Sequence, residues 1–248
     1  MTAPIERDPW TPLRAATPAR VGLGRAGSAL PTRSVLELQT ALAAARDAVH
    51  TGLDVDALLP GLTGLGLGEP IVLTSRVRDR GEYLRRPDLG RLAAGLETLP
   101  TAGWQLGCVI ADGLSSTAVQ THAVPLMSAL VEALGGRLTL APPVVVTNAR
   151  VAIGDAIGER MGLDAVLVLI GERPGLSVAD SVGIYLTHAP RAGRTDAERN
   201  CISNIHPPEG LDYATAAATA ARLVAGAREL GRSGVALKDT GAAAELPR

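Results

Sequence analysis

Short apolar runs alternate with longer amphipathic segments from about residue 104 onward. Apolar residues recur at helical spacing in Ser116–Leu134 and Asp155–Met161, which lie between these runs, and in Tyr213–Leu230, which follows them. The apolar runs are Gln105–Ala111, Leu138–Val146, Ala165–Ile170 and Val182–Thr187. Strands that alternate with helices are typical of βαβ units. We therefore predict an α/β domain over residues 96–248, with a parallel sheet and helices on its faces.

The first part of the chain, residues 1–95, shows helical periods but no convincing strand. The clearest helix pattern covers Ser34–Val49. Its apolar face consists of Val35, Leu38, Leu42 and Ala45. An arginine-dense stretch, Arg76–Arg91, follows a glycine-rich tract. The pattern predicts a small helical N-terminal domain over residues 1–95, ahead of the α/β domain.

Three polar segments follow predicted strands. Asp112–Ser116 comes after the first strand and Gly171–Gly175 after the third. A longer segment, His188–His206, follows the last predicted strand and is predicted to be a loop. In an open parallel sheet, ligands bind in the crevice beyond the carboxyl ends of the strands. We expect a binding site where these loops meet.

Composition narrows the classes of function. Lys and Arg number 24 against 25 Asp and Glu, a net charge of −1 that excludes a nucleic-acid binder working by bulk positive charge. Apolar stretches such as Ala165–Ile170 are far shorter than the roughly 18–20 residues that span a bilayer, so we expect no membrane segment. Residues 1–20 show no signal-peptide pattern, and two cysteines cannot form a disulfide framework. A cytoplasmic protein is expected.

One glycine-rich string matches a nucleotide-binding fingerprint. Gly22–Gly27 reads G-x-G-x-x-G, which binds a pyrophosphate when a strand precedes it and a helix begins after it. Here Thr17–Arg20 precedes the string, and Pro31 interrupts the segment on its other side. A turn is the better interpretation.

Asp112, Ser115 and His122 are the residue types of acyl-transfer catalysis, so a self-sufficient small α/β hydrolase is an alternative function. The Asp precedes the Ser on the same loop, and the G-x-S-x-G nucleophile elbow is absent from the sequence. Ser115 or Ser116 as N-cap of the following helix is the simpler role.

The cysteines and histidines do not predict a metal site. Cys201 and His206, five positions apart, come nearest to the ligand spacing of zinc sites, and they have no further partner in the sequence. Cys108 lies inside an apolar run and is expected in the core. Cys201 lies in a polar segment, so a role in filling an apolar core explains its presence less well than it does for Cys108.

Two groups of charged residues leave alternatives open. Glu172 and Arg173 precede Pro174 at a strand end, where they either bind a ligand or form an intramolecular ion pair. The arginines of Arg76–Arg91 form either a solvated face or a surface that pairs with carboxylates of a partner protein.

Motifs along the chain resemble the small (light) subunit of ethanolamine ammonia-lyase. The motifs are Gly24–Gly27, Tyr83–Arg91, Ile110–Ser115, Ile170–Leu176 and Cys201–His206. The resemblance runs from about Ala15 to Val224, and several long motifs in the family's order are more specific than any one of them. It implies a small helical N-terminal domain followed by a Rossmann-like parallel sheet with helices on both faces.

The resemblance also implies a function. In that family a barrel-shaped large subunit holds the substrate and uses adenosylcobalamin to convert ethanolamine to acetaldehyde and ammonia. The small subunit covers the cofactor from the other side. This chain would then be an accessory subunit of a hetero-oligomeric lyase, inactive alone and without a catalytic residue of its own. The family's cobalamin contacts fall on Val151, Glu172 and Cys201.

These residue types suit a large, nearly flat molecule fringed with amides. The carboxylate of Glu172 can accept hydrogen bonds from amide groups, and the small thiol of Cys201 can pack on the ring system. Many cobalamin mutases supply a histidine to cobalt from an Asp-x-His-x-x-Gly motif, and none of this chain's histidines lies in that setting. They are His50, His122, His188 and His206. We expect the cofactor to keep its own dimethylbenzimidazole below cobalt.

Two alternatives remain within the resemblance. Some family members carry a longer N-terminal extension that is linked to a bacterial microcompartment, whereas about a dozen residues precede the matching region here. Residence in a microcompartment and in the cytosol therefore both stay open. A scaffold protein that has lost cofactor binding is the other alternative.

Overall fold

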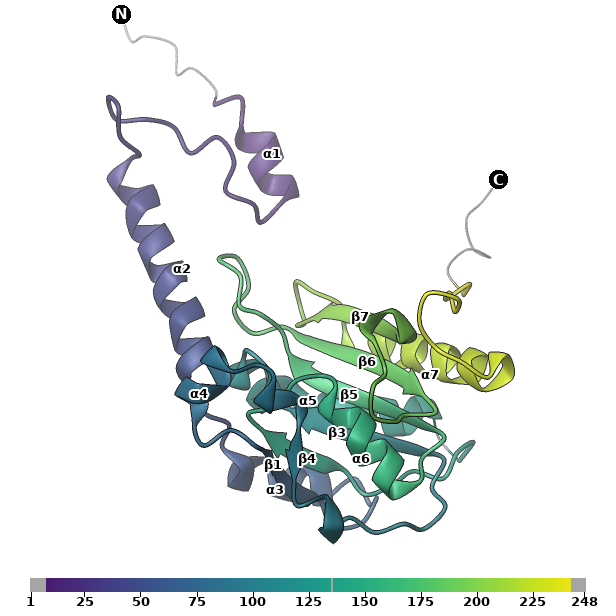
Figure 1. Cartoon of the computed structure of the whole chain (residues 1–248). Helices are drawn as coiled ribbons and strands as arrows, with labels where there is room; N and C mark the ends of the chain where they lie inside the picture. Colours follow the sequence, from purple (N-terminus) through teal and green to yellow (C-terminus); the bar gives the residue numbers. More distant parts are fainter. Residues whose placement is uncertain (1–7, 135, 242–248) are drawn as a thin grey trace, which may run out of the picture.

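The computed structural model describes residues 8–134 and 136–241, and its centre is a seven-stranded sheet (Figure 1). The strands are β1 (Ile71–Ser75), β2 (Ala93–Ala94), β3 (Leu106–Ala111), β4 (Val144–Thr147), β5 (Ala165–Gly171), β6 (Val182–His188) and β7 (Arg199–Ile205). The helices are α1 (Thr11–Ala16), α2 (Thr32–His50), α3 (Val55–Thr63), α4 (Arg80–Arg85), α5 (Ser116–Leu134), α6 (Ile153–Met161) and α7 (Tyr213–Leu230). Short 3-10 turns lie at Leu89–Arg91, Leu96–Thr98 and Asp196–Glu198.

The strand order is β2-β1-β4-β3-β5-β6-β7. The four strands β1, β4, β3 and β5 run parallel, whereas β2, β6 and β7 run antiparallel to their neighbours. A parallel connection needs a crossover of a dozen or more residues, usually with a helix. The link between β5 and β6, residues 172–181, has no helix, and β6 therefore returns alongside β5. The predicted α/β class is confirmed, with a parallel centre inside a mixed sheet.

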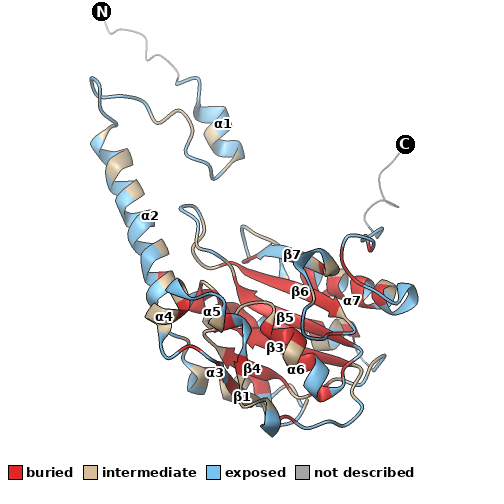
Figure 2. Ribbon diagram, viewed as in Figure 1, coloured by how far each residue is buried: buried red, intermediate tan, exposed pale blue. Residues whose placement is uncertain are grey.

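Helices cover both faces of the sheet, as predicted. On one face, Leu167 and Leu169 of β5 belong to the apolar cluster formed with α5 and α7. On the other face, Val166 and Val168 pack in the cluster that includes α6. Since side chains alternate along a strand, β5 is buried on both sides, which explains its continuous apolar run (Figure 2).

Most predicted elements from residue 104 onward lie close to their expected bounds. The helices predicted over Ser116–Leu134 and Tyr213–Leu230 are α5 and α7. The strand predicted over Leu138–Val146 begins only at Val144, as β4. Pro142 and Pro143 precede it, and proline has no N–H to donate to a sheet ladder.

Two expectations about strands are wrong. The region before residue 95 contains β1 and β2, which pair with the main sheet, so it is not purely helical. The proposed boundary near residue 95 stays a prediction. The segment His188–His206, predicted as a loop, contains β7. This strand lies at the sheet edge and exposes Cys201 and Ser203, so its sequence looks like that of a polar loop.

An arm made of α1 and α2 projects from the sheet (Figure 1). Within α1 and α2 only Ala48 is buried, and most of the arm is exposed (Figure 2). The segment that joins the two helices contains Gly22–Gly27 and follows no strand, and the last residue of the string, Gly27, lies in a turn between Ala26 and Ala29. Ser177 in the β5–β6 link donates a hydrogen bond to the Pro18 carbonyl at 3.2 Å, which ties this segment to the link. In the described parts of the chain, no helix has the length and apolar character needed to cross a membrane.

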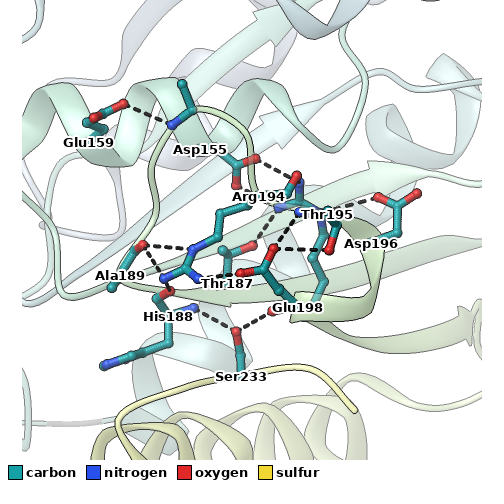
Figure 3. Close-up of polar contacts among 12 residues, drawn as sticks. Asp155, Glu159, Thr187, His188, Ala189, Arg194, Thr195, Asp196, Glu198 and Ser233 are labelled. Carbon is teal, nitrogen blue, oxygen red and sulfur yellow. Dashed lines mark hydrogen bonds and ion pairs between the residues drawn. The ribbon is translucent and has the colours of Figure 1, made fainter. Parts of the chain in front are cut away.

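A buried ion pair joins α6 to the edge strand β7. Arg199 donates to both carboxylate oxygens of Asp155, at 2.6 and 2.7 Å, and the two side chains are only 2% and 4% exposed. The same guanidinium donates to Thr187 of β6 at 2.8 Å. Figure 3 shows the polar contacts that surround Asp155, Thr187 and Arg194. The pair therefore fixes the position of β7 relative to the helix on the neighbouring part of the sheet.

Removing one partner of this pair leaves a buried charge without compensation. We expect Asp155→Ala to lower the free energy of unfolding by about 3–5 kcal/mol. The matched control is Arg33→Ala, which breaks an exposed i,i+4 pair with Glu37 and is expected to cost about 0–1 kcal/mol. Urea denaturation of the purified chain measures both values. An Asp155→Ala loss no larger than the control's would contradict a structural role for the pair.

Candidate functional site

Asp112, at the carboxyl end of β3, holds two strand-end segments together. Its carboxylate accepts from the backbone N–H groups of Asn148 and Ala149, at 2.8 and 2.9 Å, just after β4. It also accepts from Arg80 of α4 at 2.9 Å. Burial raises the pKa of Asp112, while the Arg80 charge and these N–H donors act in the opposite direction. Asp112 is thus a structural anchor at the edge where the loops meet.

Tyr83 of α4 positions the beginning of the segment before α6. The ring is fully buried, and its hydroxyl donates to the Ala149 carbonyl at 2.9 Å. Guanidinium carbons of Arg80 and Arg150 lie 4.8 and 4.6 Å from the ring centroid, within cation–π distance. Sequence reasoning missed this role, because only the folded chain brings Tyr83 to Ala149 and Arg150.

The hydrolase alternative is not supported by the geometry. Asp112 is engaged as described above, Ser115 donates to the Ala179 carbonyl at 2.9 Å, and His122 is hydrogen-bonded to the Tyr213 hydroxyl at 2.7 Å. Ser115 also accepts from the Ala118 N–H at 3.2 Å, the N-cap role that was predicted. Seven positions along a helix separate two groups by about 10 Å, so Ser115 and His122 do not form a nucleophile–base pair.

Two glycines let the loops after β3 and β5 approach backbone to backbone. A Cβ atom on Gly113 would lie 2.2 Å from the Gly171 carbonyl oxygen, and one on Gly171 would lie 2.1 Å from the Ser115 carbonyl oxygen. Gly113 also has a φ of +56°, which few other residues adopt. The Leu114 N–H donates to the Gly171 carbonyl at 3.0 Å and closes the contact. This approach shapes the hollow beside it.

The hollow lies at the carboxyl ends of the parallel strands and has a volume of about 270 Å³. Its lining comes from the loops after β3, β4 and β5 and from the face of β6. The lining residues are Gly113, Leu114, Arg150, Val151, Ile170, Gly171, Glu172, Arg173 and Tyr185. Two of the predicted contacts, Val151 and Glu172, therefore lie in one hollow. Small-ligand pockets run to roughly 300–1,000 Å³, so this one suits the edge of a large ligand rather than the whole of it.

Cys201, the third predicted contact, lies beside the hollow on β7. It is the direct cross-strand partner of Tyr185, whose ring lines the hollow, and such partners have Cβ atoms roughly 4.5–5.5 Å apart. Cys201 is exposed, and desolvation is the largest influence on the pKa of its thiol and raises it. The thiol is thus neutral at neutral pH. Sequence reasoning missed Tyr185, since its place beside Cys201 depends on the register of an unexpected strand.

Glu172 has one oxygen engaged and one free. Oε2 accepts from the Ser181 hydroxyl at 2.7 Å and from the Asn204 N–H at 3.1 Å, which joins the β5–β6 link to β7. Oε1 has no donor among the described residues. Over the same residues, Glu172 and Arg173 do not pair with each other, so the intramolecular ion pair considered from the sequence is not formed. A carboxylate oxygen thus remains open for a ligand.

The side chains that could ligate a metal are dispersed over the described chain. Within residues 8–134 and 136–241, no three His, Cys, Asp or Glu side chains gather closely enough to hold an ion. Cys108 is buried in the core, as predicted, and burial raises the pKa of its thiol to about 12. The hollow thus offers one carboxylate, arginine side chains, backbone groups and an aromatic ring.

Comparison with known proteins places the chain in a family. The family described as "Ethanolamine ammonia-lyase light chain (EutC)" matches residues 7–238. A protein of Rhodococcus erythropolis named ethanolamine ammonia-lyase small subunit is 60% identical, over 96% of this chain and 92% of its own length. Proteins of the same name from Azotobacter vinelandii and Ralstonia nicotianae are 48% and 47% identical, over 98% and 99% of this chain and 93% and 92% of theirs. The matched family and the motifs at the strand ends agree: the chain belongs to the ethanolamine ammonia-lyase light chain family.

Proposed function

We propose that this chain is the light subunit of an adenosylcobalamin-dependent ethanolamine ammonia-lyase and covers the cofactor opposite a barrel-shaped large subunit. The observation that carries the proposal is the convergence of Val151 and Glu172 in one hollow, with Cys201 beside it on the next strand. These positions lie far apart in the sequence: Val151 and Glu172 follow the ends of β4 and β5, and Cys201 lies within β7 as the cross-strand partner of Tyr185.

The residues around the hollow fit cobalamin. The free carboxylate oxygen of Glu172 would accept hydrogen bonds from amides at the rim of the corrin, and its other oxygen is fixed by Ser181 and Asn204. The neutral thiol of Cys201 and the side chain of Tyr185 are cross-strand neighbours beside it, on one face of the sheet. Bound adenosylcobalamin supplies the radical chemistry, which takes place in the large subunit. The light chain binds and orients the cofactor and excludes water from its lower side.

The exposed arm is proposed to dock on the large subunit. The predicted apolar face of α2 is only partly covered within the chain: Val35 and Leu38 are half-buried, and Leu42 is 51% exposed. A helix face of this kind usually gains its stability from tertiary packing. The arginines near α4 add donors for partner carboxylates, and Arg85, which is exposed at the end of α4, belongs to this group.

If the chain is an accessory subunit, its activity depends on the partner. We expect the purified chain to show no deamination of ethanolamine, with or without adenosylcobalamin, because the substrate pocket lies in the large subunit. Mixing it with the large subunit and adenosylcobalamin should restore acetaldehyde formation, measured by coupled reduction with alcohol dehydrogenase. Deamination by the isolated chain would contradict the assignment.

Substitution of Glu172 tests cofactor binding directly. We expect Glu172→Ala in the reconstituted complex to weaken cobalamin binding about ten- to a hundredfold, because a hydrogen bond to a charged group contributes about 1.5–3 kcal/mol. Equilibrium dialysis with cyanocobalamin measures the affinity. Unchanged affinity would favour a scaffold that has lost cofactor binding.

Two controls separate the carboxylate from its structural contacts. Ser181→Ala removes one internal hydrogen bond of Glu172 but keeps the free oxygen, and its effect on cobalamin affinity should be much smaller. Glu229→Ala changes an exposed carboxylate on α7, on the other face of the sheet, and should leave the affinity unchanged. Similar losses in all three variants would indicate general destabilisation.

A further inference from the structure

A second hollow, rich in arginine, adjoins the first. It shares Arg150, Val151 and Arg173 with the hollow described above, so the two lie next to each other. Its full lining is Pro87, Arg91, Arg150, Val151, Ala152, Arg173 and Asp196. The arginines come from three separate segments: the turn after α4, the segment before α6 and the link after β5. The fold therefore concentrates positive charge beside the proposed cofactor site.

These arginines have no counterions within the described chain. Among the ion pairs of residues 8–134 and 136–241, none includes Arg91, Arg150 or Arg173. The acidic group in the lining, Asp196, lies 3.4 Å from Nε of Arg199, which is itself held by Asp155. The net charge of the lining is positive. An anion is the complement that this surface lacks.

Arg150 shows most clearly that the positive charge of this hollow has no negative partner in the described chain. Its guanidinium and that of Arg80 both lie against the ring of Tyr83, but Arg80 has Asp112 as counterion. The Nε atom of Arg150 is shielded from solvent and has no acceptor among the described residues. Its backbone N–H donates to the Gly90 carbonyl at 2.8 Å, which holds it next to the turn that carries Arg91. The side chain is thus positioned at a cost that an anionic partner would offset.

The turn that leads into α6, residues 151–152, adds to the same hollow. The backbone N–H groups of Val151 and Ala152 have no acceptor among residues 8–134 and 136–241, and both residues line the hollow. These free N–H groups lie directly before the N-terminal end of α6, where the helix dipole is positive and attracts anions. Two independent sources of positive potential, arginine side chains and a helix terminus, therefore meet at one place.

We propose that Arg91, Arg150 and Arg173, with the turn that leads into α6, bind the phosphodiester of the cobalamin nucleotide loop. This inference rests on the proposed cofactor role of the chain. When dimethylbenzimidazole is coordinated below cobalt, the nucleotide loop hangs from the lower side of the corrin, which is the side assigned to this chain. The phosphodiester of that loop is a permanent anion, and arginine matches phosphate oxygens with two parallel donors.

The test compares corrinoids that differ in the phosphate group. The complex of light and large subunits is titrated with cyanocobalamin, with cobinamide phosphate and with cobinamide, which lacks the phosphate and the base. The light-chain variants are Arg91→Gln and Arg173→Gln, both at exposed positions, and Arg173→Lys as the conservative change. Arg228→Gln, exposed on α7 at the opposite face, is the matched control. Equilibrium dialysis gives each dissociation constant.

We expect each glutamine variant to weaken binding of cyanocobalamin and of cobinamide phosphate about tenfold and to leave cobinamide unchanged. Arg173→Lys should retain part of the affinity, and Arg228→Gln all of it. Equal losses for all three corrinoids, or no loss, would overturn the phosphate assignment. So would a weaker association of the two subunits without corrinoid, which would instead assign these arginines to carboxylates of the large subunit. A wild-type complex that binds none of the corrinoids would refute the proposed function itself.

Discussion

The paired charges of Arg199 and Asp155 join α6, which packs on the parallel part of the sheet, to the edge strand β7. A buried ion pair is weak evidence of added stability, because removing two charges from water costs about as much as their attraction returns. Its value lies in geometry: two parallel hydrogen bonds allow one relative position of α6 and β7. Val151 lies just before α6, and Cys201 lies two residues after Arg199 on β7. The same interaction therefore sets the distance between two residues of the proposed cofactor site.

Asp112 has the corresponding effect on the parallel half. It ties the end of β3 to the segment after β4, and Tyr83 adds a second contact to that segment through the Ala149 carbonyl. Gly113 and Gly171 bring the next loop into direct backbone contact. The rim of the hollow is thus fixed by internal contacts before any ligand binds, and a site that is already ordered pays less conformational entropy on binding.

The sequence predicts those elements whose buried residues recur at the regular spacing of a helix or a strand. α5 and α7 each pack one face on the sheet, and β3 and β5 are buried on both sides, so their periods are clear. β7 was missed because Cys201 and Ser203 face away from the core, and nothing in an isolated sequence shows that such residues belong to a strand. Val151, Glu172 and Cys201 were found through the family resemblance. Tyr185 and Arg150 acquire their roles only from contacts between distant segments, which no local pattern contains.

The missed strand and the proposed function have a common physical cause. α6 contains nine residues and covers the centre of the sheet, while none of the α-helices in the described part of the chain covers the same face of β6 and β7 (Figure 1). Side chains alternate along a strand, so Cys201 shares this open face with Arg199, and Tyr185 shares it with Thr187. Arg199 and Thr187 are buried, and Arg199 is bound to Asp155 of α6, whereas Cys201 is exposed. A sheet face that lacks a covering helix needs another cover, and a flat cofactor held against a second subunit would provide one. The polar residues of β7 make it look like a loop in the sequence, and residues of this kind are what an interface with a ligand requires.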